Sequence, residues 1–209
     1  MDFMLKTVFD YILHLDTYLT VLIQNYGIFI YPILFFVIFV ETGFVLLPFL
    51  PGDSLLFIAG TFAAAGALNV YLIFFLLVMA AVLGDTVNYW LGYYFGEKVF
   101  SRFIKPEHLA KTRSFFDRYG KKTIVLARFV PVVRTFAPFV AGIGKMNYFT
   151  FLSYNISGGI LWVAFFVFAG FYFGNVSFVK NNLSAFVILI IVISSLPALF
   201  EYFKHKRKK

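Results

Sequence analysis

The sequence predicts an all-α integral membrane protein with two inverted repeats. Each repeat is a re-entrant helical hairpin followed by a transmembrane helix; an amphipathic helix precedes the pair and a transmembrane helix follows it. Of the 209 residues, 61% are hydrophobic and 13% are charged, about half the charged fraction usual in soluble domains. Two apolar stretches, 41–60 and 126–144, each contain two prolines and two charged residues. A simple membrane-spanning helix contains neither.

Two pairs of short motifs indicate that one unit is duplicated. The recurring motifs are FIAG at 57–60, FVAG at 139–142, LGYYFG at 91–96 and AGFYFG at 169–174. Each predicted span also holds one tryptophan, Trp90 in the first and Trp162 in the second. The predicted unit is therefore one hairpin followed by one span.

The first re-entrant hairpin is predicted over 27–66. Its first arm, 27–47, is long enough to cross the bilayer alone, which would place the N-terminus inside. Pro48, Pro51 and Gly52 instead break the helix, and an apolar run returns after them. Broken backbone at membrane depth persists only where protein or a watery cavity satisfies its polar groups, so the hairpin is preferred.

The second unit follows the same plan. A transmembrane helix over 69–96 closes the first unit, a second hairpin is predicted over 123–145, and a second transmembrane helix over 147–174. Pro131 and Pro138 are expected to break the second hairpin. Between the units, the segment is rich in lysine and arginine, which predicts a cytoplasmic amphipathic segment over 97–122.

The two ends of the chain complete the predicted topology. Residues 1–26 have near-helical apolar spacing and predict an amphipathic helix on the membrane surface; a partner-binding helix is the alternative. A last transmembrane helix is predicted over 183–203, followed by a basic cytoplasmic tail at 204–209. With 97–122 also inside, the two hairpins open to opposite sides. Inverted repeats with broken helices at the midplane are typical of secondary transporters.

Four charged residues in the hairpins form the candidate site: Glu41 and Asp53 in the first, Arg128 and Arg134 in the second. A charge at the bilayer centre costs about 2.5–3.5 kcal/mol on insertion scales, so the opposite charges are expected to meet. Arginine binds phosphate through two parallel hydrogen bonds, and carboxyl groups can take up and release protons. Two buried salt bridges with a purely structural role are the alternative.

Two further polar residues, Asp85 and Asn88, share one face of the first span because they are three residues apart. They are predicted as accessory residues of the site. Asp85 is either a third acid beside the arginines or a packing anchor bonded to a neighbouring helix. Gly92 and Gly96 form a GxxxG pair, which predicts close helix packing.

Other classes of function lack support in the sequence. No Ser/His/Asp set and no histidine pair with metal-ligand spacing is visible, so we expect no enzyme, no metal and no cofactor. Ser54 is interpreted as the N-cap of a helix over 54–66, with Asp53 as the alternative cap. The basic runs lack a recognisable nucleic-acid-binding module. The oligomeric state and the coupling stoichiometry stay open.

Three long segments, ETGFVLLPFLPGDSLLFIAG, GDTVNYWLGYYFGEK and ARFVPVVRTFAPFVAG, strongly resemble the bacterial DedA family, also called the SNARE-associated or VTT-domain family. The resemblance runs over nearly the whole chain. It implies a multi-pass protein of the bacterial inner membrane, with two opposed re-entrant hairpins and a role in moving lipids that depends on the proton-motive force. The family's functional acids fall on Glu41 and Asp53, and its functional arginines on Arg128 and Arg134.

Together, the residues and the resemblance predict a transporter (flippase), linked to the proton-motive force, for a phosphate-headed lipid. Undecaprenyl phosphate, recycled for cell-wall synthesis, is the preferred substrate, and protons are the coupling ion. One alternative is a phospholipid scramblase for phosphatidylethanolamine without ion coupling. The other is a proton/cation antiporter.

Overall fold

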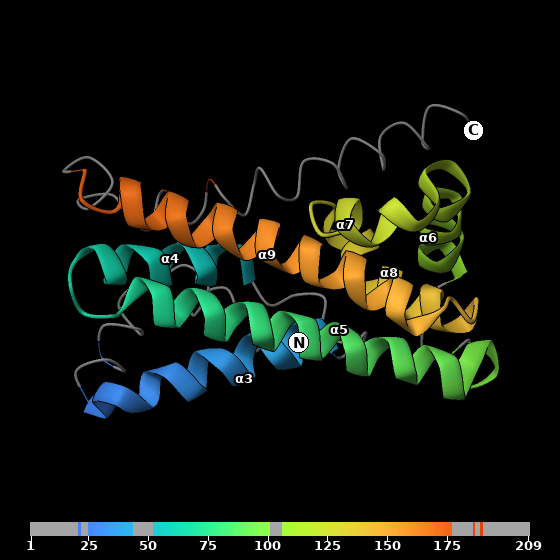
Figure 1. Ribbon diagram of the computed structural model, residues 1–209, viewed down its shortest axis with the longest axis horizontal. Helices are drawn as coiled ribbons and strands as arrows, with labels where there is room; N and C mark the ends of the chain where they lie inside the picture. Colours follow the sequence, from blue (N-terminus) through green and yellow to red (C-terminus); the bar gives the residue numbers. More distant parts are fainter. Residues whose placement is uncertain are drawn as a thin grey trace, which may run out of the picture.

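The computed structural model describes residues 25–43, 52–100 and 106–176, with positions 21, 186 and 189. Every regular element in these ranges is a helix (Figure 1), which confirms the all-α class for this part of the chain. Several predicted features lie wholly or almost wholly outside the described residues. They are the amphipathic helix over 1–26, Pro48 and Pro51, the span over 183–203 and the tail at 204–209.

Two long helices form the frame of the molecule. Helix α5 (Val70–Phe100) and helix α9 (Tyr148–Phe173) run side by side in opposite directions along nearly its whole length (Figure 1). The segments Val70–Gly96 and Tyr148–Phe173 are long and apolar enough to cross a membrane. At about 1.5 Å per residue, each exceeds a hydrocarbon core about 30 Å thick.

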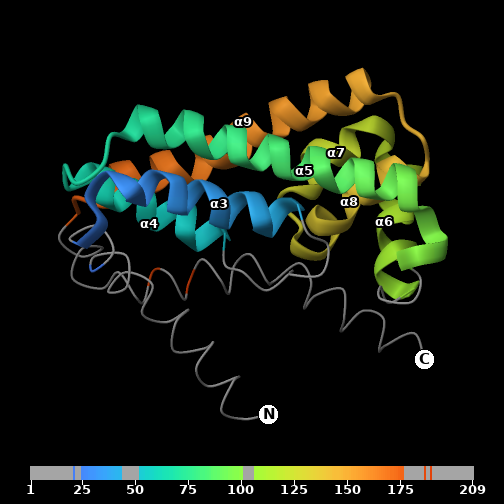
Figure 2. The ribbon, with the colours of Figure 1, turned by 90° about the horizontal axis from the view of Figure 1, so that it is seen from below.

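Shorter helices cover each half of this frame. The 3-10 helix η1 (Gly27–Phe29), α3 (Ile30–Gly43) and α4 (Gly52–Ala64) lie along one half (Figures 1 and 2). The other half holds α6 (Pro106–Tyr119), η2 (Gly120–Lys122), α7 (Thr123–Ala127) and α8 (Pro131–Ile143). Helices α3 and α7 both end near the middle of the molecule, and α4 and α8 begin there (Figures 1 and 2).

The short helices pack chiefly on the long ones. Helix α4 lies against α9, while α3 and α8 both lie against α5. Among the described helices, neither α3 nor α4 packs extensively against α8. Contacts between α3 and α4 on one side and α8 on the other therefore depend on long side chains near the middle of the molecule. The charged residues of the candidate site lie there.

Glycines allow the closest contacts between helices. In two of these contacts, a short helix from one half of the sequence packs on the long helix from the other half. A Cβ at Gly60 of α4 would lie 2.1 Å from the Val167 carbonyl of α9. A Cβ at Gly142 of α8 would lie 2.1 Å from the Tyr89 carbonyl of α5. The FIAG and FVAG motifs thus each pack on the long helix from the other half of the chain, an exchange that the motif pairs alone did not reveal.

The predicted GxxxG pair is only half correct. A Cβ at Gly92 would lie 2.1 Å from the Phe139 carbonyl, so Gly92 does permit close packing with α8. Gly96 has no neighbouring atom within 4 Å and adopts φ of +54°, a left-handed conformation that suits glycine. Its role is to let the chain bend at the end of the apolar part of α5.

The Gly142 contact can be tested by adding one methyl group. Gly142→Ala must separate α8 from α5, and overpacking of this kind costs about 1–3 kcal/mol. In detergent, we expect the melting temperature of the purified variant to fall by about 5 °C. Gly144→Ala is the matched control, because a Cβ there has no neighbour closer than 3.4 Å. An equal fall in both variants would contradict the inferred contact.

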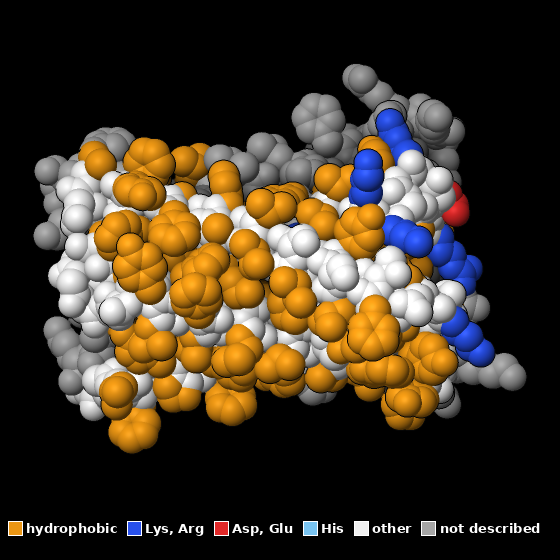
Figure 3. Space-filling model, in the orientation of Figure 1, with side chains coloured by type: hydrophobic (Ala, Val, Ile, Leu, Met, Phe, Trp, Pro, Cys, Tyr) orange, Lys and Arg blue, Asp and Glu red, His pale blue; other side chains and the backbone are white. Residues whose placement is uncertain are grey.

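Charge is distributed unevenly along the molecule. In Figure 3 most of the visible face is hydrophobic, and lysine and arginine gather at the end that holds α6. Exposed aromatic residues lie along the long helices, such as Phe75 on α5 and Phe165 on α9. Among the side chains that the structure describes, the exposed basic ones on and beside α6 are Arg113, Arg118, Lys121, Lys122 and Lys145. An apolar belt with one basic end is the surface expected of a membrane protein.

Candidate functional site

The first charged cluster joins α3, α4 and α8 through Arg134. Its Nη2 donates to Glu41 Oε1 at 2.5 Å, and its Nη1 donates to Asp53 Oδ1 at 2.7 Å. Glu41 lies near the end of α3 and Asp53 in the first turn of α4. The side chain of Glu41 is only 3% exposed, and those of Asp53 and Arg134 are 14% exposed. The structure therefore brings three of the four predicted charges together.

Gly52 makes room for this cluster. It is the first residue of α4, and its backbone N–H donates to Glu41 Oε1 at 3.3 Å. A Cβ there would lie 2.0 Å from Glu41 Oε2. Gly52 was predicted as a helix breaker; in the structure it also lets the carboxylate approach the start of α4.

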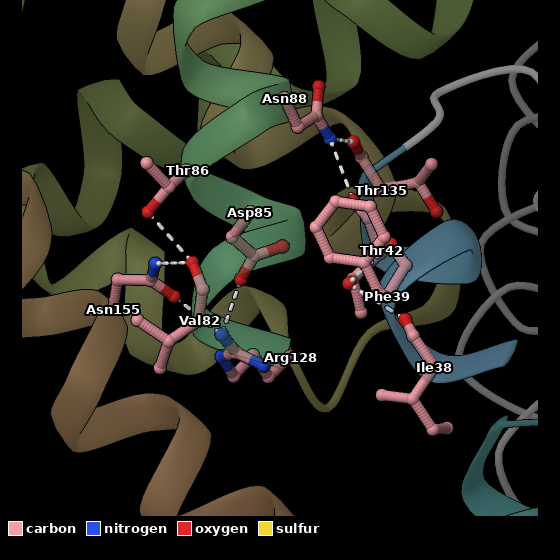
Figure 4. Close-up of polar contacts among 10 residues, drawn as sticks. All are labelled: Ile38, Phe39, Thr42, Val82, Asp85, Thr86, Asn88, Arg128, Thr135 and Asn155. Atoms are coloured by element: carbon pink, nitrogen blue, oxygen red, sulfur yellow. Dashed lines mark hydrogen bonds and ion pairs between the residues drawn. The ribbon is translucent and has the colours of Figure 1, made fainter. Parts of the chain in front are cut away.

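The second cluster surrounds Arg128, the residue that follows α7. Its Nη2 donates to Asp85 Oδ2 of α5 and, at 2.5 Å, to Asn155 Oδ1 of α9 (Figure 4). Asn155 is fixed in turn, because its Nδ2 donates to the Val82 carbonyl at 3.1 Å. The side chains of Arg128 and Asp85 are only 2% and 7% exposed. Arg128 therefore pairs with an acid of α5, whereas the acids of α3 and α4 pair with Arg134.

Both interpretations of Asp85 hold in the structure. It is a third acid beside an arginine, and it ties α5 to the segment between α7 and α8. Gly158 lets α9 approach the arginine closely, because a Cβ there would lie 3.1 Å from Arg128 Cδ. The close neighbour of Gly159 is Val82, whose Cγ2 would lie 3.2 Å from a Cβ there. The Nε and Nη1 groups of Arg128 are buried and have no acceptor among the described residues.

Asn88 occupies a different place from Asp85. Its Nδ2 donates to the carbonyl of Thr135 in α8 at 2.9 Å and to that of Thr42 in α3 at 3.3 Å (Figure 4). The hydrogen bonds found for Asn88 hold the backbones of α3 and α8 to α5, rather than an arginine.

Trp162 of α9 connects the two clusters, although the sequence marks it only as part of the repeat. Its Nε1 donates to Asp53 Oδ1 at 2.8 Å. Its ring lies 4.9 Å from Arg134 Cζ and 5.7 Å from Arg128 Cζ, within cation–π range. Asn155, which binds Arg128, was not predicted as a site residue from the sequence. The spacing of Asn155, Gly158, Gly159 and Trp162 on one helix face was the available signal.

Two local predictions about helix ends were wrong. Helix α4 begins at Gly52, so Ser54 is not its N-cap, and the buried Ser54 hydroxyl has no partner among the described residues. Asp53 is not the cap either, because it lies within the first turn and its carboxylate accepts from Arg134 and Trp162.

The two prolines predicted to break the second hairpin differ in their effect. Pro131 is the first residue of α8, where the missing N–H leaves no helical bond unmade. Pro138 lies inside α8, which continues to Ile143, so the prediction that it breaks the hairpin was wrong. Proline in a helix interior removes one hydrogen bond, to the residue four before it. Packing of α8 on α5 is sufficient to keep the helix continuous across this site.

Comparisons with known proteins agree on one family. The VTT domain family matches residues 44–172. The chain is 50% identical over 204 residues to "Protein DedA" of Escherichia coli K12, covering 95% of this chain and 93% of that protein. It is 42% identical to an uncharacterised membrane protein of Mycobacterium leprae, covering 80% of this chain and 77% of the relative.

A more distant relative is "Inner membrane protein YqjA" of Escherichia coli K12, 32% identical over 69% of this chain and 68% of that protein. No solved structure gave a significant match. Since the family match covers more than half of the chain and the identity to "Protein DedA" extends over nearly all of it, this chain belongs to the DedA family of membrane proteins, which carry the VTT domain.

Proposed function

We propose that this protein is a flippase, linked to the proton-motive force, that carries a phosphate-headed lipid across the bacterial inner membrane, with undecaprenyl phosphate as the lipid. One observation carries the proposal: buried Arg128 and largely buried Arg134 both lie within cation–π range of one indole ring, and their guanidinium groups have different partners. Arg128 has two N–H groups without an acceptor among the described residues. Arg134 is held by two acids that protons can neutralise.

Exchange at Arg134 supplies the coupling. Ionised Glu41 and Asp53 occupy its guanidinium group; protonated, they release it to a phosphate. Three acids and two arginines leave one negative charge in excess when all are ionised, so an entering phosphate adds to an existing surplus. Proton uptake by the acids offsets that surplus. A proton crossing the membrane supplies about 2.3 kcal/mol per 100 mV, and the lipid moves without covalent chemistry.

The helix arrangement supports a corresponding placement in the membrane. Helices α5 and α9 cross the bilayer in this proposal, whereas α3–α4 and α7–α8 enter from opposite sides and return as re-entrant hairpins. The basic end near α6 then faces the cytoplasm, and the C-terminal tail lies on the same side. The antiparallel long helices and the crosswise glycine contacts favour the inverted repeat.

Purified protein in liposomes tests the proposal. Undecaprenyl phosphate uptake is measured with and without an imposed pH gradient, beside undecaprenol, which lacks the phosphate, and phosphatidylethanolamine. We expect gradient-dependent uptake of undecaprenyl phosphate alone, since only its headgroup can bind the arginines. Equal movement without a gradient would identify a scramblase. Proton movement without lipid movement would identify an antiporter.

A further inference from the structure

Trp162 contacts both arginine clusters. The proposed exchange of carboxylates for phosphate at Arg134 does not by itself require this tryptophan. Its side chain is fully buried. It lies on the α9 face that also carries Asn155 and Gly158, which hold the side chain of Arg128. One face of a single rigid helix thus supports parts of both clusters.

The indole N–H binds the oxygen that Arg134 also binds. Asp53 Oδ1 accepts from Arg134 Nη1 at 2.7 Å and from Trp162 Nε1 at 2.8 Å. When Arg134 turns away to a phosphate, Asp53 retains the indole donor. A largely buried carboxyl group left without any donor would be destabilised by the loss of its hydration. Trp162 therefore keeps Asp53 in place throughout the exchange.

The ring links the two guanidinium groups. Both Cζ atoms lie within about 6 Å of its centroid, the range of cation–π attraction. Because one ring lies within this range of both cations, displacement of Arg134 changes the surroundings of a ring that Arg128 also contacts.

We propose that Trp162 is a positioning residue that couples the two clusters: its N–H holds Asp53 while Arg134 exchanges carboxylates for phosphate, and its ring transmits that exchange to Arg128. This inference rests on the proposed function and deepens it. The charged groups that face Asp53 are Glu41 from α3 and Arg134 from α8, with Arg128 across the ring and Asp85 behind Arg128.

The first test needs no transport. The chain has two tryptophans, so Trp90→Phe leaves Trp162 as the sole indole fluorophore. We expect its emission to change with pH in detergent, and Asp53→Asn in the same background to remove that change. Asp117→Asn, at an exposed position of α6, is the matched control and should leave the change intact. Emission that does not respond to pH would overturn the inferred coupling of Trp162 to Asp53.

The second test separates coupling from folding. Trp162→Phe keeps an aromatic ring and removes the N–H. We expect its affinity for undecaprenyl phosphate to stay within about threefold of the wild type, whereas the pH gradient no longer accelerates uptake. Trp162→Leu also loses both ring contacts and should bind the lipid about tenfold more weakly.

Trp90→Phe is the control for the second test. Trp90 lies in a separate aromatic group, with ring centroids 5.4 Å from Tyr93 and 5.2 Å from Tyr148, and gradient-driven uptake should be unchanged. If Trp162→Phe lowers uptake equally with and without a gradient, Trp162 is only structural and the inference fails. If the wild type moves no lipid, the proposed function and the coupling role both fail, while the fluorescence titration still decides whether Trp162 senses Asp53.

Discussion

Replacing Arg134 by alanine is expected to lower undecaprenyl phosphate uptake by about 100-fold or more. The substitution removes the guanidinium group and leaves Glu41 and Asp53 as buried carboxylates without the cation that both contact. Breaking a buried pair in this way costs about 3–5 kcal/mol of folding stability. Loss of the phosphate contact lowers uptake separately, by a factor of about ten for each 1.4 kcal/mol lost from the transport step. Uptake into liposomes and melting in detergent are measured together.

Additional variants separate loss of folding from loss of transport. Arg134→Ala combined with Glu41→Gln and Asp53→Asn removes the uncompensated charges, so the melting temperature should recover while uptake stays absent. Arg134→Lys keeps the charge but not the planar fork that binds phosphate at two points, and should restore stability more than uptake. Arg118→Ala, on the exposed face of α6, should transport normally. Uptake by the triple variant would show that Arg134 is not needed for the phosphate.

Exchanging the charges of the second cluster is the other change with a large expected effect. Arg128→Asp alone places two acids together in a buried site, which should lower the melting temperature strongly. Combined with Asp85→Arg, it restores opposite charges, and the melting temperature should rise again. Uptake should nevertheless stay about 100-fold below the wild type, because the guanidinium group now projects from α5 and its donors no longer face the same ligand position.

This exchange distinguishes a scaffold from a transport site. If the Asp85–Arg128 pair only holds helices together, the double variant recovers stability and transport in parallel. If Arg128 binds the lipid phosphate, stability recovers without transport. Arg128→Lys provides a milder comparison that keeps the charge on the original segment. Full transport by the double variant would remove Arg128 from the proposed phosphate site.

The apolar composition and the isolated charges, which predict a membrane protein with a charged site, can be recognised in the amino-acid sequence. A charge within a long apolar stretch is costly in a membrane, so Glu41, Asp53, Arg128 and Arg134 could be recognised as one candidate site from their signs and positions in the chain. The duplicated motifs likewise drew attention to Gly92 and Gly142. Each of these signals is local, because it depends on a residue type and its immediate neighbours.

The choice of partners, in contrast, depends on how the helices pack. Three acids and two arginines allow several pairings of similar electrostatic energy. Packing of α3 and α8 on α5 selects Asp85 for Arg128 and leaves Glu41 of α3 and Asp53 of α4 to Arg134. The same packing keeps α8 helical across Pro138.

Trp162 is the clearest example of a contact that the sequence does not predict. In the sequence it is one aromatic residue among 46, and an aromatic residue in an apolar span is ordinarily part of the core. In the structure it belongs to the core as well, and its N–H reaches Asp53, 109 positions away. The order of residues is enough to say which side chains carry charge into the membrane. Which of those side chains meet follows from the three-dimensional fold, because the approach of distant helices depends on packing along their whole length.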